Sequence, residues 1–239
     1  MTSRRFGVFC MGLGALLLVS AALLMTNNHR QETYAGQTAE TVLEKMQETL
    51  LRQDRQLILP GETPAPEMAE SADTRLPQQA AEDTPRAGAT PVPDMPIMTI
   101  DGQEYIGYLE LPTLDLSLPV MSQWSYAGLK IAPGRYSGST YADNMVVCAH
   151  NYAKHFSPIK WLTEGAQVYF TDMDGMRWTY EVSYVENLQP TQIEEMTEKT
   201  EESNEWDLTL FTCTTGGSAR CAVRCVRTGY PALTTETAE

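Results

Sequence analysis

Two side chains suited to nucleophilic catalysis stand at the ends of apolar segments. Cys213 ends the segment Leu208–Cys213 just before a Gly-rich turn, and His150 lies at the end of the segment Met145–Asn151. A cysteine thiolate is a strong nucleophile, and histidine is the side chain that most often moves the proton in such reactions. The chain has only three histidines, so few residues could take that second role.

A pair of arginines follows the turn after Cys213. Arg220 opens the next apolar segment, and the alternation of a strand places Arg220 and Arg224 on one face. Two cations on a buried face need partners, so this face should be open or lined by acidic groups. We expect Arg220 to be the cation that stabilises an oxyanion beside Cys213, with Arg224 as the alternative.

The remaining cysteines and histidines favour structural roles. Cys221 and Cys225 lie four residues apart on one predicted strand, about 13 Å, which is too far for a mutual disulfide. We expect both to be small buried side chains. Cys148 shares a strand face with His150 and is predicted to pack near the site, whereas His155 is predicted to lie on the surface. No pair has the Cys-x-x-Cys spacing of a zinc ribbon or redox motif.

These residues sit in a region of short, mostly alternating apolar segments broken by Gly, Pro and Asp. Seven strands with turn signals between them predict an all-β barrel or sandwich. The expected strands are Tyr105–Leu111, Leu116–Met121, Met145–Asn151, Gln167–Asp172, Trp178–Val185, Leu208–Cys213 and Cys221–Arg227.

Helices are predicted at only two places in this region. Phe156–Leu162 has room for one or two turns. Thr191–Ser203 is a candidate helix in which Thr191 and Glu194 have the spacing of a capping box. The acidic run from Glu194 to Asp207 holds seven acidic residues and one lysine, which is typical of a solvated helix face.

The N-terminus carries the most hydrophobic segment. Phe6 to Met25 is a run of 20 residues without charge, about 30 Å as a helix, which matches the hydrocarbon core of a bilayer. It could be a cleaved secretory signal, but its length favours an uncleaved signal anchor. Arg4 and Arg5 before the run favour an N-terminus inside the cell and the rest outside.

Between this run and the β-rich region lie two further segments. Residues 38–57 place Val42, Met46 and Leu50 on one apolar stripe, which predicts a stalk helix that could pack on the domain, self-associate or lie on the membrane. Residues 60–96 contain eight prolines and few large apolar side chains, which predicts an extended spacer. We therefore divide the chain into a cytoplasmic stub and anchor (1–27), stalk helix (28–59), spacer (60–97), catalytic domain (98–232) and tail (233–239).

The charge is strongly negative. The chain has 17 Lys and Arg against 31 Asp and Glu, a net charge of −14, which argues against a nucleic-acid partner. From residue 97 onward there are nine basic and nineteen acidic residues, so the acidity is concentrated outside the predicted anchor.

Several motifs resemble one family. The pentapeptide Thr209–Cys213 (TLFTC) is similar to the TLxTC signature of sortases, the cysteine transpeptidases of Gram-positive bacterial surfaces. Val147–Asn151 resembles the strand that carries the sortase histidine, and Arg220–Arg224 resembles the strand that carries the arginine. Ile106–Pro112 and Leu118–Val120 look like the opening strands of that family.

This resemblance implies a closed eight-stranded sortase β-barrel after a transmembrane helix and linker, with site roles for the matching residues. Cys213 would form a thioester with a sorting signal of the LPxTG type, His150 would transfer protons, and Arg220 would stabilise the oxyanion. Substrate-binding roles would fall to Thr212, Asn151 and Arg224. No cofactor or metal ligand is expected; carboxylates that could bind Ca²⁺ are plentiful, but they lack EF-hand spacing.

The resemblance also implies partners and a location. The enzyme would be a single-pass cell-membrane protein with its catalytic domain outside. It would act on surface proteins with a C-terminal sorting signal and transfer them to an amine of a peptidoglycan precursor or a pilin. The acidic run between the fifth and sixth expected strands resembles the insert of class B enzymes, and the subclass stays open between class B-like and class D-like. Two alternatives stay open: an extracytoplasmic cysteine protease that releases free acid, and a non-catalytic surface β-domain.

Overall fold

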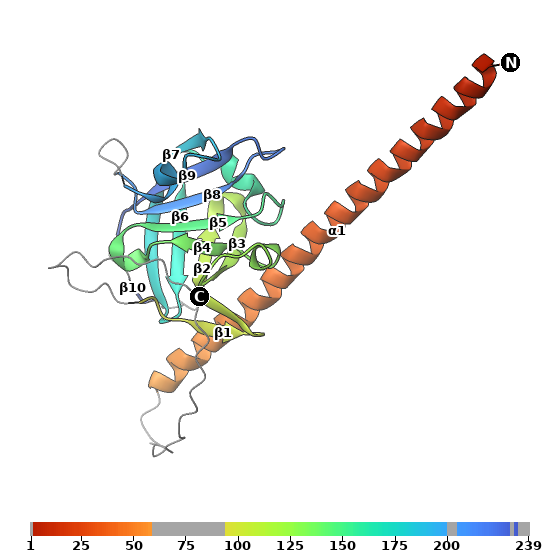
Figure 1. The fold of residues 1–239 in the computed structure, drawn as a ribbon. Helices are drawn as coiled ribbons and strands as arrows, with labels where there is room; N and C mark the ends of the chain where they lie inside the picture. Colours follow the sequence, from red (N-terminus) through yellow and green to blue (C-terminus); the bar gives the residue numbers. More distant parts are fainter. Residues whose placement is uncertain (1, 59–93, 200–204, 230–231, 234–239) are drawn as a thin grey trace, which may run out of the picture.

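The computed structural model describes residues 2–58, 94–199, 205–229 and 232–233. A β-barrel lies beside one end of a long helix, α1 (Thr2–Ile58), whose N-terminal part projects away from it (Figure 1). The predicted spacer lies outside the described residues as far as residue 93, and so does most of the predicted tail.

Ten strands form the sheet in the described part of the chain. They are β1 (Met98–Ile100), β2 (Gln103–Leu111), β3 (Leu116–Met121), β4 (Gly134–Ser137), β5 (Met145–Ala149), β6 (Gln167–Asp172), β7 (Met176–Leu188), β8 (Leu208–Cys213), β9 (Arg220–Arg227) and β10 (Ala232–Leu233). The short helices between them are η1 (Pro112–Leu114), η2 (Gly128–Lys130), η3 (Thr140–Ala142), η4 (Ser157–Trp161) and α2 (Ile193–Thr197).

Eight of these strands close into a barrel. They pair in the order β2-β3-β4-β5-β8-β9-β7, and β6 completes the ring because it pairs with both β7 and β2. All seven expected strands are confirmed. The eighth, β4, is only four residues long and has the sequence Gly-Arg-Tyr-Ser, which lacks an apolar alternation. β1 and β10 extend the sheet beside β2 and β7.

The barrel interior is filled by alternate side chains of its strands. In β8 the inward residues include Leu208 and Leu210, and in β9 they are Cys221, Val223 and Cys225. Both cysteines are free and buried, as expected. The intervening residues of β8 and β9 therefore point outward, and this face carries Cys213 and Arg220.

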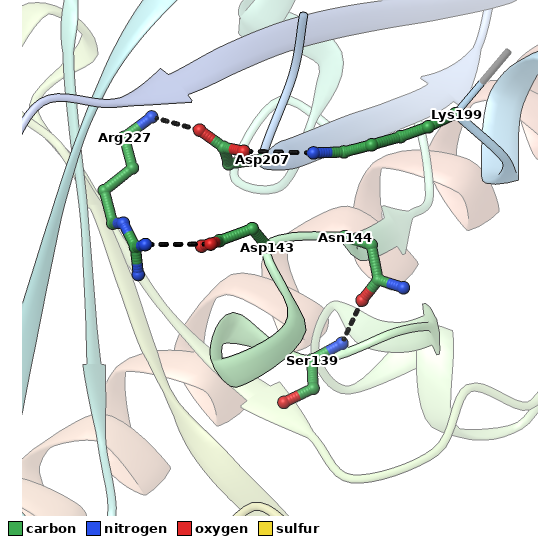
Figure 2. Close-up of polar contacts among 6 residues, drawn as sticks. All are labelled: Ser139, Asp143, Asn144, Lys199, Asp207 and Arg227. Carbon is green, nitrogen blue, oxygen red and sulfur yellow. Dashed lines mark hydrogen bonds and ion pairs between the residues drawn. The ribbon is translucent and has the colours of Figure 1, made fainter. Parts of the chain in front are cut away.

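A polar cluster joins the starts of β5 and β8 to the end of β9 (Figure 2). The Asp207 carboxylate accepts a hydrogen bond of 2.7 Å from the Arg227 backbone N–H and pairs with Lys199 at 3.1 Å. The Arg227 guanidinium lies 2.8 Å from Asp143, just before β5. The Met145 N–H also donates to the Asp207 carbonyl. These contacts hold three strands in register at the barrel end remote from Cys213.

Helix α1 unites the predicted anchor and stalk, because it runs unbroken through residues 27 and 28. Ala35, Ala39, Val42 and Met46 form a stripe with 3% exposure or less, whereas the residues from Met11 to Met25 are exposed. Val42 and Met46 join a cluster of barrel side chains that includes Tyr105. Of the three possibilities for the stalk, the structure therefore shows packing on the domain.

The loop after His150 meets α1 closely. A Cβ atom placed on Gly36 would lie 2.9 Å from the Lys154 Cβ, so only a glycine permits this approach. Lys154 also faces Glu40 at 3.8 Å. His155 is fully buried beside the backbone of Ala35, which corrects the prediction of a surface histidine. The sequence pattern missed this because α1, which covers His155, lies more than a hundred residues earlier.

The two predicted helices have different outcomes. The short helix expected within Phe156–Leu162 is confirmed as the 3-10 helix η4 (Ser157–Trp161). The capping box at Thr191 is wrong: α2 begins after Gln192, which makes no side-chain cap, and the helix ends at Thr197. The side chain of Gln192 instead accepts a hydrogen bond from the Gln189 N–H.

The buried His155 predicts a loss of stability at mildly acidic pH. Burial lowers the pKa of His155 to about 4, whereas the unfolded chain should keep a value near 6.5. As the pH falls from about 6.5 to 4, the unfolded chain gains a proton that the folded chain does not, so the free energy of unfolding decreases, by at most about 3 kcal/mol.

Urea unfolding of the full chain in detergent at pH 7.5 and 5 measures this effect. A His155→Leu variant should lose less stability between the two pH values than the wild type. His29→Gln, at an exposed position of α1, is the matched control and should behave like the wild type. An equal loss in His155→Leu and wild type would contradict the assignment.

Candidate active site

Cys213 and His150 meet because β5 and β8 are parallel neighbours in register. Their ladder runs from Met145 opposite Leu208 to Ala149 opposite Thr212, so His150 and Cys213 are the next residues along the two strands. The Thr212 hydroxyl donates a hydrogen bond of 2.8 Å to the Ala149 carbonyl and ties the strands together at this step. The two candidate residues, 63 positions apart in the chain, thus lie on neighbouring strand ends.

Arg220 joins this pair through the hairpin of β8 and β9. Cys213 and Arg220 are partners in the antiparallel ladder, as the last residue of one strand and the first of the next. The turn between them is closed by the Thr214 N–H, which donates to the Ala219 carbonyl at 2.9 Å. The Arg220 guanidinium donates to the carbonyls of Gly217 and Ala219 and stays partly exposed.

Arg224 lies on the same face of β9 as Arg220, but in a part of that face that other segments cover. Its side chain is fully buried, and its guanidinium pairs with Glu186 at 2.8 Å and donates to the Thr209 hydroxyl at 2.9 Å. It also donates to the carbonyls of Met196 and Glu195. The expected acidic partner is thus present. Because these bonds engage every nitrogen of the guanidinium, the geometry does not support Arg224 as a substrate-binding residue.

A pocket of about 560 Å³ opens beside Cys213. Thr212 and Asn151, the other two expected substrate-binding residues, both line it. The rest of the lining comes from η4, the end of β7, the β8–β9 turn and the start of β9, namely Ser157, Lys160, Asn187, Thr214, Thr215, Ser218, Ala219 and Cys221. The sequence reasoning did not single out Lys160 or Asn187, because neither belongs to a recognisable motif.

A separate, largely buried apolar cluster covers the outer face of β5, β8 and β9. Phe211, two residues before Cys213, packs in a cluster with Val146 and Cys148. Tyr136 contacts Phe211 edge to face and stacks on Trp124, with 5.3 Å between ring centroids in each pair. This aromatic row shares no residue with the lining of the polar pocket.

Cys148, a second thiol near the site, is buried and not available for chemistry. Cys148 is 4% exposed within this apolar cluster. Burial raises the pKa of the Cys148 thiol to about 12, and the nearby Cys213 adds to this rise. Cys148 therefore packs beside the site, as expected, whereas Cys213 is partly open to solvent.

His150 lies in a half-buried environment that favours the neutral ring. Burial lowers the pKa of the His150 imidazole, and the positive charge of Lys130 lowers it further. The ring rests against Tyr152, with 4.9 Å between centroids. A neutral imidazole can accept a proton from a thiol or an amine, so His150 is suited to act as a base beside Cys213.

Among the described residues, no group of three or more His, Cys, Asp or Glu side chains is arranged to hold a metal ion. Part of the acidic run, residues 200–204, lies outside the described residues. The arrangement at the barrel rim is a thiol, an imidazole and a guanidinium, which is a set suited to acyl transfer through a covalent intermediate.

Comparison with known proteins gives a family match. The family model described as Sortase domain matches residues 109–228. No curated protein matches the chain.

Solved structures that resemble the chain include several sortases. Sortase C1 from Streptococcus suis is 29% identical, with 53% of this chain and 74% of that chain covered and a TM-score of 0.45. Sortase C from Clostridium perfringens with the C-terminal cell wall sorting motif is 26% identical, covering 53% and 71%, with a TM-score of 0.45. Sortase A from Corynebacterium diphtheriae is 24% identical, covering 54% and 62%, with a TM-score of 0.47.

The charge of Lys130 near His150 predicts a shift in the titration of the histidine. Lys130→Gln removes a like charge, so the pKa of His150 should rise toward its ordinary value. An NMR titration of the His150 ring measures this shift. Lys154→Gln is the matched control because Lys154 faces Glu40 on α1. A His150 pKa that Lys130→Gln leaves unchanged, or that both variants raise equally, would contradict this account.

Proposed function

The chain belongs to the sortase family, and we propose on that premise that it cleaves LPxTG-type sorting signals and joins the released acyl group to an amine. At the level of the family, the activity is that of a cysteine transpeptidase. The observation that carries the proposal is the meeting of Cys213, His150 and Arg220 at one rim of the barrel through the β5–β8–β9 pairing.

The first half of the proposed reaction is acylation of the thiol. The Cys213 sulfur attacks the scissile carbonyl carbon, and the thiol proton passes to the neutral His150. The C–N bond then breaks, the leaving amine takes the proton from His150, and a thioester remains on Cys213. The Arg220 guanidinium, next to Cys213 in the ladder, is placed to stabilise the negative oxygen of the tetrahedral intermediate.

The second half transfers the acyl group. A neutral amine attacks the thioester carbonyl, and its proton passes to His150. The C–S bond breaks, and the thiol of Cys213 is restored with that proton. Water in place of the amine would give free acid, so the identity of the second nucleophile separates a transpeptidase from a protease.

Two regions beside Cys213 suit two different reactants. The partly exposed rings of Trp124 and Tyr136, which lead to the buried Phe211, support binding of the apolar leucine and proline of a sorting signal, because such residues gain most from burial against rings. The polar pocket supports the entry of a hydrophilic acceptor. Thr212 and Asn151 would contribute to substrate binding from the pocket side.

Anchoring at the membrane is part of the proposal. One described helix, α1, contains a stretch long and apolar enough to span a bilayer. With the two arginines inside the cell, the barrel would lie outside, where it meets surface proteins that carry a C-terminal sorting signal. The acceptor would be an amine of a peptidoglycan precursor or of a pilin.

An assay with and without an acceptor amine tests this function. The full chain in detergent is incubated with a labelled LPxTG-type peptide, and products and intact protein are analysed by mass spectrometry. We expect an acyl adduct on Cys213 and, with the amine present, an amide-linked product. Cys213→Ala should form no adduct, whereas Cys148→Ala, at a buried thiol, should retain it. Free acid as the sole product, formed equally fast with and without the amine, would contradict transpeptidation.

The two arginines give a second, contrasting prediction. Arg220→Ala should reduce the acylation rate by roughly 100-fold or more, as loss of an oxyanion donor does, with little change in unfolding. Arg224→Ala should instead destabilise the fold by about 3 kcal/mol, because it breaks a buried charge network around Glu186. Acylation kinetics and urea unfolding measure the two effects. A large stability loss in Arg220→Ala, or none in Arg224→Ala, would contradict the assignment.

A further inference from the structure

The polar pocket beside Cys213 has no acidic residue in its lining, although the protein is acidic. From residue 97 onward, acidic residues outnumber basic ones by nineteen to nine. Nevertheless, none of the residues that line the pocket is Asp or Glu, and one of them is Lys160. Arg220 adds a second cation beside Cys213. In such a setting the pocket favours an anionic group over a cationic one.

Lys160 is free to bind that group. It is exposed and forms no ion pair with another described residue, and its ammonium lies 5.2 Å from the ring centroid of Trp161, a cation–π contact that leaves it without an anionic partner. Its charge reaches the floor of the pocket, where it lowers the pKa of the Cys221 thiol against the larger rise caused by burial.

Hydrogen-bond donors surround the pocket as well. The side-chain amides of Asn151 and Asn187 make no hydrogen bond to another described residue. The hydroxyls of Ser157 and Ser218 also line the pocket. An ammonium together with amide and hydroxyl donors is a set that recognises a carboxylate.

We propose that this pocket binds the acyl acceptor through a carboxylate located close to its nucleophilic amine, with Lys160 as the main contact. The inference rests on the proposed transpeptidase function and specifies the chemical class of its second substrate. The pocket selects an amine that is bonded to the same carbon as a carboxylate, or to the next carbon, over a simple alkyl amine. The two ends of a diamino dicarboxylic acid are of this kind.

The same charges favour the reactive form of the amine. Only a neutral amine attacks a thioester, and nearby cations such as Lys160 and Arg220 lower the pKa of a bound ammonium group. An Asp or Glu side chain of the protein beside the amine would instead stabilise the ammonium form, and none lines the pocket. The carboxylate of the acceptor therefore supplies the binding energy, and the neighbouring amine can lose its proton to His150.

A matched pair of acceptors tests the inference. The probes are 2,6-diaminopimelate, in which each amine shares a carbon with a carboxylate, and its diamide. With the wild type, KM for the diacid should be lower than for the diamide. In Lys160→Gln the KM of the diacid should rise by about 10-fold, as the loss of a charged hydrogen bond does, and the preference for the diacid should largely disappear. Lys154→Gln, an exposed lysine outside the pocket, should keep the wild-type preference.

Direct binding separates this inference from the proposed function. Diaminopimelate is titrated into the Cys213→Ala chain, with and without Lys160→Gln, and followed by NMR shifts of pocket residues. Weaker binding with Lys160→Gln would support the inference even if the wild type forms no acyl adduct, which would defeat the transpeptidase function alone. Equal binding with and without Lys160→Gln, or an unchanged acceptor preference in the kinetics, would overturn the inference.

Discussion

The parallel pairing of β5 with β8 is the constraint on which the site depends. It places His150 next to Cys213, and the β8–β9 hairpin then places Arg220 beside the same cysteine. A slip of one residue in either ladder would turn one of these side chains into the barrel. The cluster around Asp207 and Arg227 opposes such a slip, because it fixes the starts of β5 and β8 against the end of β9 (Figure 2).

The barrel is also fixed to the helix that precedes it. The docked stripe of α1 begins at Ala35, beside the loop that follows His150. Ten residues of continuous helix, about 15 Å, separate Ala35 from Met25 at the end of the apolar run. The distance between the apolar run and the catalytic rim is therefore set by a rigid helix. The Pro-rich segment joins the far end of α1 to β1 and does not determine this distance.

Sequence patterns predicted most of the barrel because its strands alternate or form short apolar runs, and three of them, including Leu208–Cys213, have the predicted bounds. The same alternation predicted that Arg220 and Arg224 share a face. It could not tell which of the two is open, since that depends on Glu186 and on the segment around Met196 that covers Arg224. The burial of His155 was missed for a related reason, because a segment distant in the chain covers it, whereas Lys160 belongs to no recognisable motif.

The central claim is that one strand pairing brings His150 and Cys213 together, and a disulfide trap tests it most directly. In a His150→Cys variant that also carries Cys148→Ala, mild oxidation should link positions 150 and 213. Neighbouring residues of adjacent strands lie within the Cα separation that a disulfide requires. Mass spectrometry of the digested protein should show this cross-linked peptide as the main product. If position 150 stays reduced, or links to Cys221 or Cys225 instead, the pairing described for the site is contradicted.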